Sequence, residues 1–189
     1  MCSIIGYLGD EPAAPVLVKG LKRMEYRGYD SVGVATFSGN QISIRKGVGK
    51  VMEVNSRVKL DTLSGTVGIG HTRWATHGGV TDVNAHPHPS SSGNIAIVHN
   101  GIIENYAELK KELQEKEYAF KSETDSEVIA NLLQYNFDQT KEIKKSIIQT
   151  VSRLKGNFAF VAVFENGTLA AARFHEPLIV GVGKEGYFV

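Results

Sequence analysis

The sequence contains very little cysteine: Cys2 is the only one in 189 residues, and it lies one peptide bond from the initiating methionine. A single cysteine excludes an internal disulfide and a metal site built from several thiolates. Any chemistry of this thiol therefore involves the sulfur atom alone or together with nitrogen and oxygen groups.

Two further features are missing, a strong charge imbalance and a long apolar run. Lysine and arginine number 21 against 20 aspartates and glutamates, which gives a net charge of +1. No basic block interleaved with aromatic residues is present, which argues against a nucleic-acid partner. No apolar run approaches the ~20 residues of a bilayer span, and no signal peptide is recognisable. We therefore expect a soluble, cytoplasmic protein that binds no membrane.

The pattern of apolar residues predicts α+β architecture, because hairpin-like strands alternate with separate groups of helices. Asn166-Gly167 is typical of a tight hairpin turn. We expect strands at residues 3–8, 32–36, 41–46, 66–71 and 94–99 and in the segment from 157 to 189. Helices are expected near residues 17–24, 105–116, 125–135 and 142–154, and Asn105 with Glu108 resembles a capping box.

The position of Cys2 gives it a possible role that an internal cysteine cannot have. If Met1 is removed, the thiol and a free α-amino group lie on the same residue, and both titrate near neutral pH. The amine could then accept the proton of the thiol without help from a histidine. The alternative is a small apolar residue at the edge of a strand.

The segment HTRWATHGG (71–79) follows a predicted strand and contains the only tryptophan. Arg73 in such a position could bind a carboxylate through two parallel hydrogen bonds, a geometry that lysine does not offer. The alternative is an arginine paired with an acid inside the fold. The sequence KGVGKV (46–51) lacks the features of a nucleotide-binding loop.

Five histidines lie within 29 residues, which raises the question of a metal site. No HExxH motif is present, and His88 lies in an extended AHPHP segment where successive side chains point to opposite faces. We therefore expect no metal. A histidine-bound metal remains the alternative that metal analysis would test.

Asn100 and Gly101 follow an apolar strand in the segment VHNGIIEN (98–105). Asn-Gly favours a turn. The side-chain amide of Asn100 and the N–H of Gly101 could also converge on one oxygen atom as an oxyanion hole. Asp125 begins a predicted helix, where it could cap the helix or face a ligand ammonium group.

These segments, taken together and in order, resemble a known enzyme family. The segments that carry the resemblance are Met1-Cys2, YRGYDSVG (26–33), HTRWATHG (71–78), NAHPH (84–88), HNGIIEN (99–105) and SETDSEV (122–128). They resemble the glutaminase domains of the glutamine–fructose-6-phosphate aminotransferases, also called glucosamine-6-phosphate synthases. These domains are class II, N-terminal-nucleophile (Ntn) glutamine amidotransferases.

The resemblance implies a four-layer αββα sandwich of antiparallel sheets and a glutaminase that hydrolyses L-glutamine to glutamate and ammonia. Cys2 would be the nucleophile with its α-amine as base, and Asn100 and Gly101 would form the oxyanion hole. The implied glutamine-binding residues are Arg73, Trp74, Thr76, His77 and Asp125, with Arg27 close to the nucleophile. No cofactor is implied.

The resemblance also makes residues 2–189 a glutaminase domain that is shorter than usual at its C-terminus, without the sugar isomerase domains of the family. Incomplete sheet edges could pair with a second copy to give a homodimer. Residue 3 is serine where the family usually has glycine. The remaining alternatives are a non-catalytic glutamine-binding domain with Met1 retained and the glutaminase domain of another class II amidotransferase.

Overall fold

A computed structural model describes residues 2–75 and 78–189, which form two sheets and the helices that cover them. The first sheet has the strand order β3-β2-β4-β1-β10-β9, and the second has the order β5-β6-β7-β8. Neighbouring strands in both sheets are antiparallel. The strands are β1 (Ser3–Gly9), β2 (Ser31–Ser38), β3 (Gln41–Val48), β4 (Val67–Arg73), β5 (His88–Pro89), β6 (Ile95–Ile103), β7 (Gly156–Phe164), β8 (Leu169–Phe174), β9 (Gly181–Gly183) and β10 (Gly186–Phe188).

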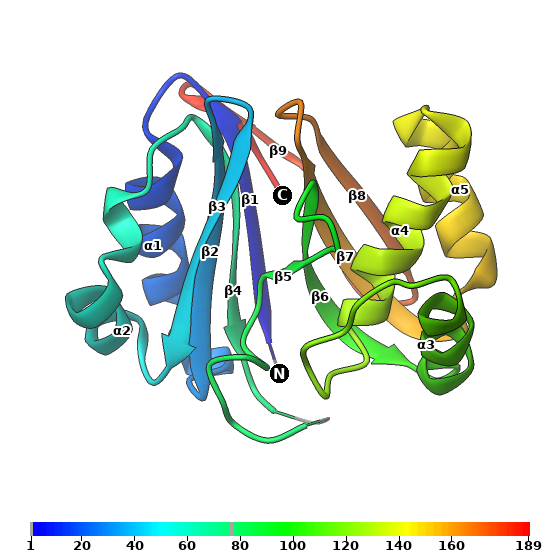
Figure 1. Cartoon of the computed structure of the whole chain (residues 1–189). Coiled ribbons are helices and arrows are strands. Elements are labelled where there is room, and N and C mark those ends of the chain that lie inside the picture. The colour runs from blue at the N-terminus through cyan, green and yellow to red at the C-terminus, as the bar shows by residue number, and fades with distance from the viewer. Residues whose placement is uncertain (1, 76–77) are drawn as a thin grey trace.

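The helices lie on the outer faces of the two sheets, as Figure 1 shows. One layer contains α1 (Ala13–Met24) and α2 (Val51–Val58), with short 3-10 turns at Glu25–Arg27 and Leu60–Thr62. The other layer contains α3 (Tyr106–Glu115), α4 (Glu127–Thr140) and α5 (Ile143–Arg153). This confirms the predicted α+β class and the four-layer αββα sandwich.

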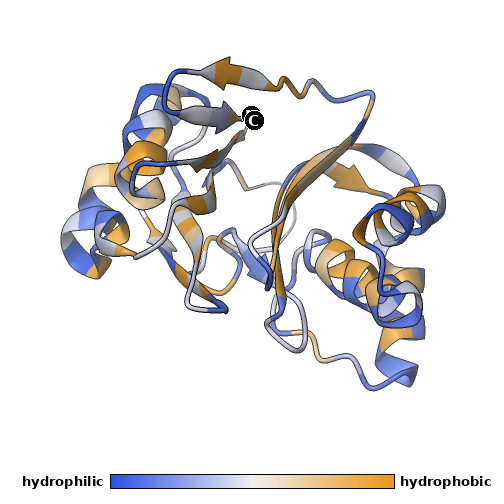
Figure 2. Cartoon of the chain, turned by 90° about the horizontal axis from the view of Figure 1, so that it is seen from above, coloured by the Kyte–Doolittle hydropathy of each residue, from blue (hydrophilic) through white to orange (hydrophobic). Residues whose placement is uncertain are grey.

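Three apolar clusters hold the four layers together, one for each boundary between layers. The first helix layer packs on its sheet through residues such as Leu17 and Leu21, and the second through residues such as Phe160 and Leu133. Between the sheets, the buried cluster consists of small and β-branched side chains: Ala35, Ile69, Ala96, Val98, Val161 and Val163. Figure 2 shows the same arrangement from above, coloured by hydropathy. The two sheets are thus joined through a buried apolar interface.

Two glycines of β4 let helix α1 approach its sheet closely. A Cβ atom at Gly68 would lie 2.9 Å from Leu17, and one at Gly70 would lie 2.9 Å from Leu21. Both distances are too short for a normal carbon contact. The alternation of glycine and larger residues in this strand therefore follows from packing against α1.

The expected secondary structure differs from the observed structure at several element ends. Helix α2 was not predicted, and α4 continues to Thr140 instead of ending near residue 135. The proposed capping box at Asn105 is wrong, because its side chain instead bonds the backbone of Arg153 and Lys155 across the α5–β7 connection. This long-range bond satisfies the amide in a way that local sequence does not reveal.

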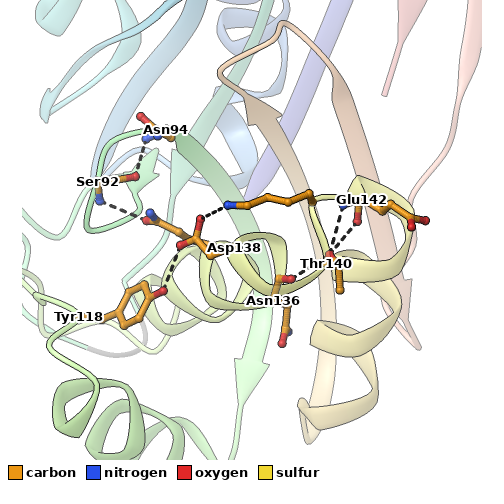
Figure 3. A network of polar contacts seen from close by, with 9 residues as sticks. Ser92, Asn94, Tyr118, Asn136, Asp138, Thr140 and Glu142 are labelled. Carbon is orange, nitrogen blue, oxygen red and sulfur yellow. Dashed lines mark hydrogen bonds and ion pairs between the residues drawn. The ribbon is translucent and has the colours of Figure 1, made fainter.

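The end of α4 has its own polar network, which Figure 3 shows. Asp138 accepts a hydrogen bond from the hydroxyl of Tyr118 at 3.2 Å. Thr140 donates its hydroxyl hydrogen to the carbonyl of Asn136 at 2.9 Å and accepts a bond from the N–H of Glu142 at 3.3 Å. These bonds satisfy backbone groups where α4 ends and α5 begins. Among the helices of the described residues, none is both long and apolar enough to span a bilayer.

Candidate active site

The thiol of Cys2 lies just before β1 and contacts Trp74, the residue that follows β4. The N–H of Trp74 donates a hydrogen bond to the Cys2 sulfur at 3.2 Å, and the thiol lies 3.5 Å from the Trp74 carbonyl oxygen. Burial raises the pKa of the Cys2 thiol above its usual value, and the Trp74 N–H partly opposes this effect. The next residue, Ser3, is buried and donates a hydrogen bond to the Met24 carbonyl at 3.4 Å.

Asn100 and Gly101 approach Cys2 from the second sheet. They lie within β6 and pair with Ala159 and Phe158 of β7, so the turn that Asn-Gly favours does not form. Gly101 has a φ of +115°, and a Cβ atom there would lie 2.0 Å from the Asn157 carbonyl oxygen. The Nδ2 group of Asn100 donates a hydrogen bond to the Cys2 carbonyl at 3.4 Å. The strand therefore keeps its pairing while glycine accommodates an unusual backbone angle.

A cleft and a smaller recess meet at Cys2, Trp74 and Gly101, which line both of them. The cleft has a volume of about 680 Å³ and extends toward the segment 176–179. The recess has a volume of about 20 Å³ and is lined by residues that include Arg73, His99 and Asp125. The thiol thus lies between the cleft and a polar recess that is lined by one positive side chain, Arg73, and one negative side chain, Asp125.

Arg73 is almost fully buried and lies at the end of β4. Its guanidinium donates hydrogen bonds to the carbonyls of Gly79 at 3.1 Å and Gly78 at 3.4 Å. Asn84 and Glu123 hold the same segment, since Asn84 donates to the Gly79 carbonyl at 3.0 Å and the Gly79 N–H donates to Glu123 at 3.3 Å. The guanidinium is therefore fixed near the recess by backbone contacts.

Asp125 is buried and lies two residues before α4. Its carboxylate accepts a hydrogen bond from the Ile103 N–H at 2.8 Å. The expected helix cap at Asp125 is wrong, because Ser126 precedes the first helical residue and Asp125 bonds β6 instead. This bond leaves the carboxylate in the lining of the recess.

The remaining predicted site residues lie around the mouth of the cleft or outside the described residues. Arg27 and Trp74 line the cleft, and 44% of the Trp74 surface is exposed. The ring of Trp74 makes an edge-to-face contact with Tyr29, with 5.3 Å between centroids. Thr76 and His77 lie outside the residues that the structure describes.

Four histidines form a buried cluster behind the site. The ring centroids of His71 and His86 lie 4.1 Å apart, and those of His86 and His88 lie 4.5 Å apart. His88 bonds the hydroxyl of Thr124 at 3.2 Å, and His99 bonds that of Ser126 at 2.8 Å. Within the described ranges, no three histidine, cysteine, aspartate or glutamate side chains are placed to hold a metal ion.

Burial keeps these histidines neutral. It lowers the pKa of His71 to about 3 and that of His99 to about 4, and it lowers the pKa values of His86 and His88 strongly. The segment that carries His86 and His88 is held by Lys46, whose ammonium group donates to the carbonyls of Val83, Ala85 and Pro87 at 2.6–3.1 Å. Burial also lowers the pKa of Lys46, to about 8.

Comparison with known proteins identifies the family. The model of the family described as "Glutamine amidotransferase domain" matches residues 71–189. This chain belongs to the glutamine amidotransferase domain family. It is 48% identical to the glutamine–fructose-6-phosphate aminotransferases of Pyrococcus horikoshii and Caldanaerobacter subterraneus, over its whole length.

The match covers only part of those relatives, since this glutamine amidotransferase domain spans 32% and 31% of their lengths. A solved structure of the glutamine phosphoribosylpyrophosphate amidotransferase from B. subtilis, in complex with ADP and GMP, superposes with a TM-score of 0.83. That alignment has 27% sequence identity and covers all of this chain and 41% of the other. The similarity to both groups agrees with the resemblance found in the sequence.

Two residues of this amidotransferase domain were not assigned any role from sequence. Asp30 accepts a hydrogen bond from the Ala75 N–H at 2.8 Å and so holds the chain two residues after β4. His71 contacts both His99 and Asn100 through Nε2, at 3.0 Å in each case. Asp30 and His71 lie in the segments YRGYDSVG and HTRWATHG, but only the folded chain reveals their contacts.

We expect Gly101→Ala to destabilise the domain by about 3 kcal/mol or more, because the new methyl group combines backbone strain with a clash against β7. Gly93→Ala is the matched control: Gly93 also has a positive φ, of +81°, but its added Cβ would contact nothing within 4 Å. Urea unfolding of both variants measures the difference. Equal losses of stability would contradict the proposed clash.

We expect the buried neutral His99 to make the domain sensitive to acid. The pKa of His99 is about 4 in the folded protein and about 6.5 in the unfolded chain. The neutral ring therefore makes its full contribution to the free energy of unfolding above pH 6.5, and this contribution is lost as pH falls toward 4. Between these two pKa values, His99 is expected to lower the free energy of unfolding by about 1.4 kcal/mol for each pH unit of acidification. His99→Asn retains a nitrogen that can bond Ser126 but does not titrate. Unfolding free energies of both proteins from pH 7.5 to 4 should therefore converge on acidification, and a constant difference would contradict the assignment.

Proposed function

We propose that this domain hydrolyses L-glutamine to L-glutamate and ammonia through a γ-glutamyl thioester on Cys2. The observation that carries the proposal is that Cys2 meets two residues of the other sheet. Gly101 lines both the cleft and the recess as Cys2 does, and Asn100 lines the cleft and bonds the Cys2 carbonyl. Membership of the glutamine amidotransferase domain family supports glutamine as the substrate.

The two charged side chains in the lining of the recess, Arg73 and Asp125, suit the amino acid end of glutamine. Asp125 would bind the α-ammonium group, and Arg73 would bind the α-carboxylate after the guanidinium exchanges its bonds to the carbonyls of residues 78 and 79. Trp74, Thr76 and His77 would line the bound substrate, and Arg27 would lie near the nucleophile at the mouth of the cleft. The carboxamide end of the substrate would then face Cys2.

The thiol needs a base, because burial raises its pKa and little thiolate forms without one. Removal of Met1 would free the α-amine of Cys2, which would take the thiol proton as sulfur attacks the amide carbon. The C–N bond then breaks, and the protonated amine gives its proton to the departing ammonia. Water releases glutamate from the thioester and restores the thiol.

Asn100 and Gly101 would stabilise the negative oxygen that forms during the attack. The backbone of β6 supports this role. The carbonyl of His99 faces His71, and the N–H of Ile103 faces Asp125, so both point away from β7. Since the backbone groups of every second residue share one side of a strand, we expect the N–H of Gly101 to point the same way.

The whole protein's activity is a further proposal. Because the relatives are about three times longer, we propose that ammonia from this domain serves the synthesis of glucosamine 6-phosphate from fructose 6-phosphate when sugar isomerase domains are present. We also propose a cytoplasmic location and, for the isolated domain, pairing into a homodimer at a sheet edge. Size-exclusion chromatography with light scattering tests the last point.

The test of the proposed function is glutamate release, with intact mass measured on the same sample. We expect loss of Met1, and covalent labelling of Cys2 alone by a glutamine-like electrophile such as 6-diazo-5-oxo-L-norleucine. A non-catalytic glutamine-binding domain would instead retain Met1, bind glutamine and release no glutamate. Labelling at any other residue would overturn the mechanism.

We expect Asn100→Ala to lower kcat by about 10²-fold or more, because it removes one donor to the developing oxyanion. Asn94→Ala is the control, since the backbone of Asn94, not its side chain, makes its hydrogen bonds, to Ser92 and Glu165. The control variant should retain the wild-type rate. Normal turnover by Asn100→Ala would exclude Asn100 from the oxyanion hole.

A further inference from the structure

We propose that His71 is a positioning residue that fixes the orientation of the Asn100 amide, so that its N–H₂ group faces the reacting oxygen. The inference rests on the proposed glutaminase function and adds a residue to its machinery. His71 lies in β4 of the first sheet, whereas Asn100 lies in β6 of the second, so the contact crosses the interface between the sheets.

The hydrogen bonds of His71 determine which of its ring nitrogens carries the hydrogen. Nε2 lies 3.0 Å from the backbone carbonyl oxygen of His99. A carbonyl oxygen can only accept a hydrogen bond, so Nε2 must be the protonated nitrogen of the ring. The low pKa of His71, about 3, leaves the ring neutral, with this single N–H.

The protonated Nε2 in turn determines the orientation of Asn100. The same N–H lies 3.0 Å from Oδ1 of Asn100. An amide turned by 180° would place its N–H₂ group against another donor, which is unfavourable. Oδ1 therefore faces His71, and Nδ2 faces Cys2, to whose carbonyl it donates at 3.4 Å.

The ring of His71 is itself held in place by its surroundings. His71 is fully buried, its ring packs against His86 at 4.1 Å, and His86 packs against His88. Among the described residues, Nδ1 of His71 has no hydrogen-bond partner. The direction of the ring is therefore set by packing and by its two acceptors, His99 and Asn100.

The orientation of Asn100 matters for rate more than for binding of glutamine. An amide turned the other way would remove a donor from the oxyanion and present a partial negative charge to it. The side-chain hydrogen bonds of the groups proposed to bind the α-carboxylate and α-ammonium go elsewhere: Arg73 bonds the carbonyls of residues 78 and 79, and Asp125 bonds the Ile103 N–H. Substitution of His71 should therefore lower kcat and leave KM almost unchanged.

A pair of amide substitutions tests this role. Gln has a nitrogen as many bonds from Cα as Nε2 of histidine, whereas the Asn nitrogen matches Nδ1. We expect His71→Asn to lower kcat by about 10²-fold and His71→Gln to recover most of that loss. His175→Asn is the control, because His175 is exposed and its φ of +63° is one that asparagine tolerates.

A double variant of His71 and Asn100 distinguishes an effect of His71 on the orientation of Asn100 from a general effect on the structure. In the Asn100→Ala background there is no amide to orient, so adding His71→Asn should change kcat by less than about threefold. A full additional loss of about 10²-fold in that background would overturn the inference. Equal losses in His71→Gln and His71→Asn, accompanied by equal falls in melting temperature, would overturn it as well.

The tautomer of His71 gives a readout that does not depend on turnover. Long-range ¹H–¹⁵N NMR spectra of the ¹⁵N-labelled domain at pH 7.5 should show a neutral ring protonated on Nε2. A ring protonated on Nδ1 would overturn the inference even if the domain is active. Absence of glutamate release from the wild-type domain, with the Nε2–H tautomer present, would instead count against the proposed function alone.

Discussion

The close packing of the two sheets is the constraint on which the site depends. Cys2 precedes a strand of one sheet, and Asn100 and Gly101 belong to a strand of the other. The fully buried side chains between the sheets, such as Ala35, Ala96 and Val161, are small or β-branched. Because these side chains are short and stiff, they hold the sheets at a nearly fixed separation. A larger residue in this layer would move Cys2 away from Asn100 and Gly101.

Near Cys2 the apolar interface gives way to polar groups that are still buried. His71, Arg73 and Asp125 are each no more than 4% exposed, so each needs a partner inside the protein. Arg73 bonds backbone carbonyls, Asp125 bonds a backbone N–H and His71 bonds a carbonyl together with an amide. The backbone of β6 and of the segment 78–79 thus supplies partners for all three buried polar groups.

Sequence patterns predicted the architecture well because apolar periodicity reflects burial directly. The strands at 3–8 and 94–99 and the helix at 142–154 are close to the observed β1, β6 and α5. Asn105 and Asp125 were interpreted as helix caps, yet each bonds a distant part of the chain. Local sequence patterns do not reveal such bonds. The backbone groups that these side chains bond, in place of a helix N-terminus, are distant in sequence and come close only when the chain folds.

The same limit applies to the site. Cys2, Arg73, Asn100, Gly101 and Asp125 were selected from sequence, and the fold brings all five to the two connected cavities or their junction. Asp30 was missed, because its role consists of one bond to the backbone of Ala75, 45 positions away. In sequence, Asn-Gly is ambiguous between a turn and a strand. The structure shows that pairing with β7 outweighs the local turn preference of Gly101.

The histidine cluster shows how a fold changes the chemistry of a residue type. Histidines close together in sequence raised the question of a metal site. Burial lowers their pKa values so far that a proton is costly at neutral pH, and one ring nitrogen of His71 is committed to two oxygen atoms. A neutral, fixed imidazole is a poor proton carrier but a good directional donor. Its value in this site therefore lies in geometry. In the proposed mechanism, the acid–base role belongs to the α-amine of Cys2 that removal of Met1 would free.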